Sequence, residues 1–357
     1  MKEDSSRTAK VVRLAIIGTG NMAKMHAILF KGIPGCHLVA AVDTDKDRVT
    51  AFATEHGIPK VYTSTQELLA RADIDAVSIV TPDRFHAEVS IECLQAGKHV
   101  LCEKPLAIDY PEAARMVIAA EKAGVVNMVN FSYRNFPCLQ RVAELIGEGA
   151  IGEIRHVEAS YLQAWLVSKV WGDWRTSPTW LWRLSSEHGS KGVLGDVGVH
   201  ILDFATFPVG KLKRVYCRLQ SFEKAPDNRI GEYHLDANDS AVMTVEFVNG
   251  ALGTIHMSRW VAGHVNRQFL KISGTLGTVE IDSERSSQSY RIFTGEDLDT
   301  NEWHTVEVEP TPDNHTRFIE SIQSGKQDPL DFARGAEIQK IIDACFESDE
   351  RGMPVEL

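Results

Sequence analysis

The chain has 357 residues, of which 43% are hydrophobic and 24% charged, a composition that is ordinary for a globular protein. Its formal net charge is −11 and it contains no basic block, which excludes nucleic acids and anionic membrane surfaces as expected partners. The length exceeds what one hydrophobic core usually organises, so we expect two domains.

The sequence predicts a cytoplasmic protein. Residues 1–11 form a polar extension without the apolar core of a signal peptide, and the longest apolar runs are too short to cross a bilayer. The cysteines follow no CxxC or Cys-His spacing, so we expect reduced thiols and no metal site. They are Cys36, Cys93, Cys102, Cys138, Cys217 and Cys345.

Residues 12–130 alternate short apolar strands with helical patterns. The strands are rich in valine and isoleucine, as expected for strands buried on both faces of a parallel sheet. Several of the helices between them end at glycine. This alternation predicts an α/β domain with helices on both faces of a parallel sheet. The predicted strands read VRLAIIG, HLVAAVD, DAVSIVT, HVLCE and VVNMVNF.

After about residue 150 the strands change to alternating apolar and polar residues. Asn249-Gly250 is a strong hairpin signal between two of these strands. We therefore assign residues 131–357 to an α+β domain with an open, mainly antiparallel sheet, one face of which is free to receive a ligand. Two closing helices are predicted in HTRFIESIQSG and ARGAEIQKIIDACFESDERG.

A G-x-G-x-x-A motif lies between the first predicted strand and helix, formed by Gly18, Gly20 and Ala23. Gly18 permits a tight turn, Gly20 lets the backbone approach a pyrophosphate, and Ala23 lets the helix pack closely on the strand. The start of the helix, at Asn21 and Met22, offers free N–H groups to phosphates. The motif predicts dinucleotide binding.

Asp43 ends the second predicted strand, at the spacing expected of an acid that accepts hydrogen bonds from the adenosine ribose. A carboxylate repels a 2′-phosphate, which favours NAD over NADP. Arg48 can offset that repulsion, so NADP stays possible. The alternative is a glycine turn in a non-binding domain, with Asp43 as a surface acid.

Two later loops also follow predicted strands. In a doubly wound sheet the carboxyl ends of the strands line the cofactor crevice. Thr81 and Pro82 lie in the first of these loops, and Glu103 and Lys104 in the second, and all four are predicted to contact the cofactor. His86 is assigned to the following helix, in a structural or surface role.

Asp196, His200 and Asp203 are polar exceptions in the apolar segment GVLGDVGVHILDFATF. Their spacing places them on one face of a helix. An acid four residues before a histidine can hold its ring and raise its basicity. Gly192 and Gly195 would let a ligand approach the start of this helix. The alternative is a capped helix with His200 in the core.

These segments resemble the glucose–fructose oxidoreductase, inositol dehydrogenase and MocA (Gfo/Idh/MocA) family of NAD(P)-dependent oxidoreductases. GKHVLCEKPLA is the most specific motif, and the resemblance spans nearly the whole chain. Further matches follow in the family's order in VTPDRFHAE, VNFSYRNFPCLQRVAELIGEGAIGEI and GDVGVHILDF. The resemblance implies a Rossmann domain followed by an α+β domain whose open sheet often mediates oligomers, here a homodimer or homotetramer.

The resemblance also implies hydride exchange between a nicotinamide and a secondary hydroxyl of a sugar, sugar derivative or cyclitol. Lys104, Asp196 and His200 fall on the family's catalytic positions, and the Lys104–Pro105 bond is implied to be cis. Tyr133, Arg134 and Asp203 match positions that border or contact the substrate.

One stretch departs from the family's usual pattern, because it carries five of the seven tryptophans. Aromatic faces suit the C–H faces of sugars, which favours a substrate wall that includes Trp174 and Arg183. Packing and a subunit contact are the alternatives. The tryptophans are Trp165, Trp171, Trp174, Trp180 and Trp182.

The mechanistic hypothesis assigns proton removal from the hydroxyl to His200 as hydride leaves the carbon. Lys104 donates to the same oxygen, and Asp196 orients His200 or touches the substrate. The sequence does not decide which of Lys104 and His200 transfers the proton. The alternatives are oxidation followed by elimination, a non-catalytic NAD-sensing regulator, and a reductase of an imine or tetrapyrrole.

Overall fold

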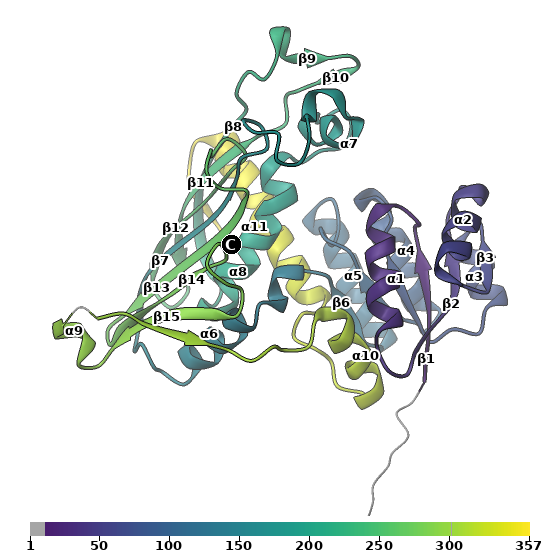
Figure 1. Cartoon of the computed structure of the whole chain (residues 1–357), viewed down its shortest axis with the longest axis horizontal. Coiled ribbons are helices and arrows are strands. Elements are labelled where there is room, and N and C mark those ends of the chain that lie inside the picture. The colour runs from purple at the N-terminus through teal and green to yellow at the C-terminus, as the bar shows by residue number, and fades with distance from the viewer. Residues whose placement is uncertain (1–10, 301) are drawn as a thin grey trace, which may run out of the picture. The chain divides into compact units, whose positions relative to one another are not determined.

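The computed structural model describes residues 11–300 and 302–357, which form two compact units (Figure 1). The first contains the described residues up to Phe131 together with Pro312–Gln339, and the second contains the described residues of Ser132–Thr311 together with Lys340–Leu357. The predicted polar extension at residues 1–11 lies outside the described residues, apart from Val11. Among the described helices, none combines the length and apolar character needed to cross a membrane.

The first unit is built on a six-stranded parallel sheet in the order β3-β2-β1-β4-β5-β6. The strand order reverses between β1 and β4, which is the point where doubly wound sheets bind ligands. The predicted doubly wound α/β fold is confirmed. The strands are β1 (Val12–Ile17), β2 (Cys36–Val42), β3 (Lys60–Tyr62), β4 (Ala76–Ile79), β5 (His99–Cys102) and β6 (Asn127–Val129).

The helices of this unit form two groups. Helix α1 contacts α2 and α10, whereas α4 contacts α3 and α5; α1 lies in front of the sheet in Figure 1, with α4 and α5 behind it. Helices α2 and α5 end at Gly57 and Gly124, with φ of +62° and +63°, as the glycine pattern predicted. The helices are α1 (Asn21–Lys31), α2 (Lys46–His56), α3 (Thr65–Arg71), α4 (His86–Gln95), α5 (Tyr110–Ala123) and α10 (Asn314–Ser324).

The C-terminal part of the chain differs from the sequence-based division, which placed all of residues 131–357 in the second domain. Pro312–Gln339 belongs to the first unit. The N–H of Val129 on β6 donates to the carbonyl of Leu330 at 3.0 Å, and the side chain of Asn127 accepts from the N–H of Phe332 at 2.8 Å. Helix α11 (Phe332–Arg351) is divided between the two units.

The second unit contains a nine-stranded sheet in the order β16-β15-β14-β13-β7-β12-β11-β8-β17. Its neighbours are antiparallel except β7 and β12, so the predicted mainly antiparallel sheet is confirmed. The strands do not all follow as successive hairpins, because β7 lies between β12 and β13. The strands are β7 (Ile154–Gln163), β8 (Leu212–Gln220), β11 (Ser240–Phe247), β12 (Leu252–Ser258), β13 (Asn266–Gly274), β14 (Gly277–Asp282), β15 (Ser289–Thr294), β16 (His304–Glu307) and β17 (Val355–Glu356). A small separate sheet pairs β9 (Arg229–Ile230) with β10 (Tyr233–His234).

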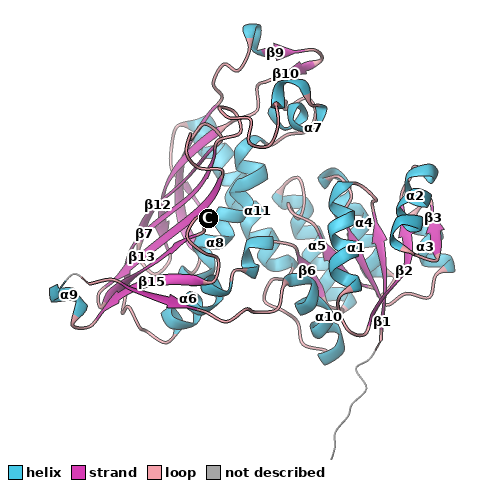
Figure 2. Cartoon of the chain, viewed as in Figure 1, coloured by secondary structure: helices cyan, strands magenta, loops and turns pink. Residues whose placement is uncertain are grey.

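The predicted hairpin at Asn249-Gly250 joins β11 to β12. Gly250 has a φ of +87°, and the N–H of Phe247 donates to the carbonyl of Ala251 at 2.9 Å. Helix α8 contacts β7, β12 and β13 and lies with α6 on one side of the sheet (Figure 2). This contact fixes the helix that carries His200. The helices of this unit are α6 (Pro137–Gly147), α7 (Pro178–Leu181), α8 (Val199–Val209) and α9 (Asp297–Thr300).

Candidate active site

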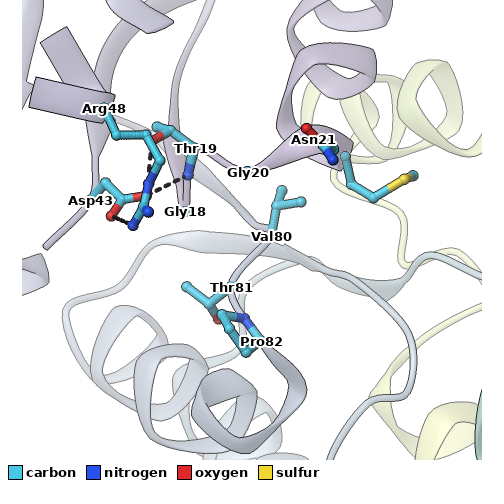
Figure 3. Close-up of a pocket in the computed structure, with 10 residues that line it drawn as sticks. Gly18, Thr19, Gly20, Asn21, Asp43, Arg48, Val80, Thr81 and Pro82 are labelled. Carbon is cyan, nitrogen blue, oxygen red and sulfur yellow. Dashed lines mark hydrogen bonds and ion pairs between the residues drawn. The ribbon is translucent and has the colours of Figure 1, made fainter. Parts of the chain in front are cut away.

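Seven of the nine predicted cofactor residues line one pocket of about 350 Å³ at the carboxyl ends of β1, β2 and β4 (Figure 3). They are Gly18, Gly20, Asn21, Met22, Asp43, Thr81 and Pro82. Sequence reasoning named Arg48 only as a neighbour of Asp43, and it missed Thr19 and Val80, which also line the pocket. The other two predicted residues, Glu103 and Lys104, follow β5.

The fold requires glycine at only one of the first two glycine positions of the motif. Gly18 has a φ of +90°, and a Cβ there would lie 2.7 Å from the carbonyl oxygen of Val80, so the fold itself requires glycine. A Cβ at Gly20, the N-cap residue of α1, would meet no atom within 4 Å. The chain's own packing does not require glycine at that position, which leaves room for a ligand beside the first N–H groups of the helix.

Asp43 is buried, and its carboxylate accepts several hydrogen bonds from the chain itself. Thr19 donates to it from both its backbone N–H, at 2.9 Å, and its hydroxyl, at 2.8 Å. The Arg48 guanidinium and the N–H of Asp45 donate as well. Burial alone would raise the pKa of Asp43, but these hydrogen bonds hold it well below its usual range. The group is therefore ionised at every physiological pH.

We predict that Asp43→Asn raises the Kd of NADH by roughly ten- to a hundredfold, because hydrogen bonds to a charged acceptor contribute about 1.5–3 kcal/mol. The Kd of NADPH should change less, since its 2′-phosphate no longer meets a carboxylate. Fluorescence titration with both cofactors measures this. Asp47→Asn, at an exposed neighbouring acid, is the matched control. Equal losses for NADH and NADPH would contradict the assignment of Asp43 to the ribose.

His86 joins the two loops that follow β4 and β5. Its Nδ1 lies 2.7 Å from the carbonyl oxygen of Pro105, and its Nε2 lies 2.9 Å from that of Thr81. A carbonyl oxygen only accepts, so both ring nitrogens must donate, and the ring is an imidazolium. Burial alone would lower the pKa of His86, but Cys102 and the two carbonyls raise it to about 9. The predicted structural role thus takes the form of a buried cation.

We predict that His86 makes the stability of the protein depend on pH. Its pKa is raised from 6.5 to about 9 on folding, so its contribution is full below pH 6.5 and is lost as the pH rises to about 9. Urea unfolding at pH 6, 7, 8 and 9 measures the free energy of unfolding. The decline over this range should be shallower in His86→Gln and unchanged in His37→Gln, at an exposed histidine of β2. A wild-type free energy that stays constant from pH 6 to 9 would refute the imidazolium.

Glu103 fixes the shape of the loop that carries Lys104. Its carboxylate accepts from Asn130 at 2.6 Å and from the backbone N–H of Lys104 at 3.1 Å, and it pairs with His26 at 2.8 Å. The other nitrogen of His26 contacts the hydroxyl of Ser78 at 2.8 Å. Burial alone would raise the pKa of Glu103, but His26, Asn130 and Lys104 lower it to about 2. A cofactor contact by Glu103 stays a prediction.

Lys104 leaves β5 at the carboxyl edge of the sheet, with a half-buried side chain. The peptide bond between Lys104 and Pro105 is cis, as the family resemblance implied. Hydrogen bonds hold the backbone on both sides of Lys104: its own N–H donates to Glu103, and the carbonyl of Pro105 accepts from His86.

In the second unit, Asp196 and His200 do not share one continuous α-helix, which corrects the prediction. Asp196 lies in a π-helical turn, Leu194–Gly198, and α8 begins after it at Val199. Such single turns occur frequently at functional sites. Asp196 accepts from the fully buried Arg259 at 2.8 Å and lies 3.8 Å from Arg183. Sequence reasoning missed Arg259, because no local pattern marks a partner 63 residues away.

The glycines before α8 are required by the chain itself and do not leave space for a ligand, which corrects a second expectation. A Cβ at Gly192 would lie 2.4 Å from the side chain of Asn238, and one at Gly195 would lie 2.2 Å from Lys191. Both positions are closely packed, so a side chain at either would displace its neighbour.

Arg134 and Asp203 form a buried ion pair. Arg134 Nε donates to Asp203 at 2.9 Å and Nη2 donates at 2.5 Å, and each residue is 2% exposed. The guanidinium also lies over the ring of Phe207. The prediction that these two residues contact the substrate is corrected, because burial and mutual pairing assign them to holding α8. Tyr133 lies edge-on to the His200 ring, with 4.8 Å between ring centroids.

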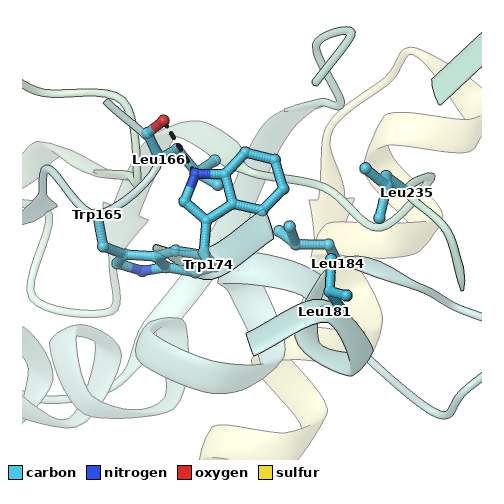
Figure 4. Packing of buried hydrophobic residues seen from close by; sticks show 6 residues of the cluster. All are labelled: Trp165, Leu166, Trp174, Leu181, Leu184 and Leu235. Carbon is cyan, nitrogen blue, oxygen red and sulfur yellow. Dashed lines mark hydrogen bonds between the residues drawn. The ribbon is translucent and has the colours of Figure 1, made fainter. Parts of the chain in front are cut away.

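The tryptophan-rich stretch packs as a hydrophobic cluster (Figure 4). Trp174 is only 2% exposed, and its indole N–H donates to the carbonyl of Leu166 at 3.2 Å. The prediction that Trp174 forms a substrate wall is therefore corrected in favour of packing. Arg183 lies at the margin of the cluster, between the Trp182 ring and Asp196. The buried members are Trp165, Leu166, Trp174, Leu181, Leu184 and Leu235.

The pocket of the first unit fits an adenine dinucleotide. The N–H groups at the start of α1, beside the open position at Gly20, suit a pyrophosphate, and the ionised Asp43 suits the donor hydroxyls of a ribose. The first unit is thus a dinucleotide-binding domain, which places the protein among those that bind a nucleotide cofactor.

Comparison with known proteins narrows this class. Residues 12–131 match the family model described as an oxidoreductase family with an NAD-binding Rossmann fold, and residues 139–280 match the GFO/IDH/MocA C-terminal domain. These matches together cover more than half of the chain. The chain belongs to the Gfo/Idh/MocA family and is an NAD-dependent oxidoreductase.

The relatives include sugar dehydrogenases. Levoglucosan dehydrogenase of Pseudarthrobacter phenanthrenivorans is 27% identical, over 94% of this chain and 96% of that protein. D-glucoside 3-dehydrogenase of Escherichia coli is 29% identical, over 99% of each chain. The solved structure of levoglucosan dehydrogenase in complex with NADH and levoglucosan superposes with a TM-score of 0.86 at 25% identity, covering 97% of this chain and 99% of that one.

Proposed function

We propose that this protein oxidises a secondary hydroxyl of a sugar, sugar derivative or cyclitol with NAD, and reduces the corresponding ketone in reverse. The observation that carries the proposal is the presence, in one chain, of a built dinucleotide pocket and of His200 on α8, whose ring lies against those of Tyr133 and Tyr161. The names of the relatives, levoglucosan dehydrogenase and D-glucoside 3-dehydrogenase, support a hydroxylated ring as the substrate.

His200 acts as the general base and takes the proton of the reacting hydroxyl at a ring nitrogen. Lys104 donates from its ammonium group to the same oxygen and stabilises the negative charge that develops there. NAD, when bound, supplies the carbon that accepts the hydride. In the direction of ketone reduction, His200 and Lys104 return the proton and polarise the carbonyl.

Asp196 supports this chemistry as a carboxylate beside the His200 helix. The buried guanidinium of Arg259 pairs with it at 2.8 Å. The carboxylate then stabilises the imidazolium that forms when His200 takes the proton. NADP remains a possible second cofactor, because Arg48 at the edge of the pocket could receive a 2′-phosphate.

We also propose that the protein is a cytoplasmic homodimer or homotetramer. All six cysteines are buried free thiols, which suits a reducing compartment. Val242 and Leu252, on the neighbouring strands β11 and β12, are 57% and 59% exposed, which supports burial of this sheet face against a second copy of the chain.

A screen of cyclitols, aldoses, anhydrosugars and sugar acids with NAD and NADP tests the proposed activity through absorbance of the reduced cofactor. We expect turnover of at least one polyol. Silence across all polyols with both cofactors would contradict the proposal. Tightly retained NAD with no net NADH would instead favour oxidation followed by elimination.

We predict that Lys104→Met lowers kcat by at least about a hundredfold, which is the typical loss when a group that assists proton transfer is removed. The Kd of NADH should stay within about threefold of wild type. Lys122→Met, at an exposed lysine of α5, should leave both values unchanged. Wild-type turnover by Lys104→Met would exclude a catalytic role for this lysine.

A further inference from the structure

Three side chains of the second unit form a closed ring of hydrogen bonds beside His200. The hydroxyls of Tyr133 and Tyr161 lie 2.6 Å apart, Tyr161 donates to Asn266 Oδ1 at 2.8 Å, and Asn266 Nδ2 donates to the Tyr133 hydroxyl at 2.9 Å. The Tyr133 ring meets the His200 ring edge-on, with centroids 4.8 Å apart. The proton transfer proposed for His200 does not involve these hydrogen bonds.

The direction of the hydrogen bonds among Tyr133, Tyr161 and Asn266 follows from Trp165. This residue lies in the tryptophan cluster of Figure 4 and is 3% exposed. An indole N–H only donates, and that of Trp165 meets Gln163 at 3.1 Å, so the atom it meets is the amide oxygen. The NH2 group of Gln163 then faces Asn266, at 2.9 Å, and donates to its oxygen. The NH2 group of Asn266 is left to face Tyr133.

The proton of each tyrosine is then assigned. Tyr161 is 2.8 Å from Asn266 Oδ1, an atom without hydrogen, so Tyr161 uses its only proton there. Between the two hydroxyls, Tyr133 must therefore donate to Tyr161. Tyr161 and Gln163 are 3% and 6% exposed, which keeps water from replacing either partner.

Tyr133 consequently has no proton left for a ligand. Its oxygen has received one hydrogen bond from Asn266 and retains one free lone pair, on a half-buried side chain next to His200. We propose that Tyr133 is an acceptor-only contact that recognises a free hydroxyl vicinal to the reacting carbinol. Four positioning residues fix which hydroxyl donates and which accepts: Tyr161, Asn266, Gln163 and Trp165.

The inference rests on the proposed function and narrows its substrate class to polyols with a free vicinal hydroxyl. An ether, ketone or fluorine at that carbon cannot donate, so each would face the lone pair of Tyr133 without a hydrogen bond. A hydroxyl at the same carbon satisfies the contact.

Deoxyfluoro substrates test whether Tyr133 only accepts a hydrogen bond from the substrate, because fluorine is close to hydroxyl in size and does not donate. The probes are levoglucosan, methyl α-D-glucopyranoside and myo-inositol, each with its monodeoxyfluoro analogues. We expect fluorination at the carbon next to the reacting one to lower kcat/KM. The factor of this loss should be about tenfold larger in wild type than in Tyr133→Phe. The inductive effect of fluorine on hydride transfer is common to both enzymes and cancels in this comparison.

Tyr161→Phe opens the ring and releases the proton of Tyr133. We expect the fluorine penalty at the same carbon to fall to within about threefold, while kcat/KM for the parent polyol also falls. Tyr216→Phe, on β8, should keep the wild-type pattern. Should Tyr161→Phe not fold, the comparison of wild type with Tyr133→Phe decides the matter alone.

These measurements test the proposed function and the role of Tyr133 separately. No turnover of any of the three parent polyols by wild type would count against the proposed function on these substrates and, with it, against this inference. Turnover with equal fluorine penalties in wild type, Tyr133→Phe and Tyr161→Phe would overturn the acceptor-only role of Tyr133 and leave the proposed function standing.

Discussion

A single buried imidazolium holds together the loops on which the cofactor edge of the first sheet depends. His86 donates to the carbonyl of Thr81, after β4, and to that of Pro105, after β5. A parallel sheet delivers the carboxyl ends of neighbouring strands to one edge, where the loops that follow them line the cofactor crevice. The protonated ring of His86 donates from both nitrogens at once, which a neutral imidazole cannot do.

Three carboxylates around the candidate sites are also paired before any ligand binds. Asp43 is held by Arg48 and Thr19, Glu103 by His26 and Asn130, and Asp196 by Arg259. Groups fixed in this way need little reorganisation when charge develops nearby. They also set a constraint on cofactor binding, because a ribose that reaches Asp43 shares that carboxylate with Arg48.

The sequence predicted the parts of the protein that local rules govern. The G-x-G-x-x-A turn, Asp43 at the end of a strand and the Asn249-Gly250 hairpin each occupy a few consecutive residues, and glycine conformation or strand periodicity determines them. The change to alternating strands after about residue 150 predicted the second domain, and the family resemblance added the cis bond before Pro105. The roles assigned to Lys104, Asp196 and His200 are still proposals.

What could not be predicted depends on partners distant in the chain. Arg259 reaches Asp196 across 63 residues, and Asn266 reaches Tyr133 across 133. The burial of Trp174 follows from a cluster that includes Leu235, and a tryptophan-rich stretch alone does not distinguish such packing from a sugar-binding wall. Pairing of Asp203 with Arg134 likewise removed two candidate substrate contacts, because composition gives no measure of burial.

The most direct test of the central claim follows the hydrogen itself. The polyol with the highest turnover, deuterated at its carbinol carbons, is oxidised by the wild-type enzyme in ordinary water with unlabelled NAD. If hydride passes directly from the carbinol carbon to the nicotinamide, mass spectrometry should find one deuterium in each NADH formed. NADH without deuterium would contradict direct hydride transfer, and with it the account of His200 and Lys104 acting on a single hydroxyl.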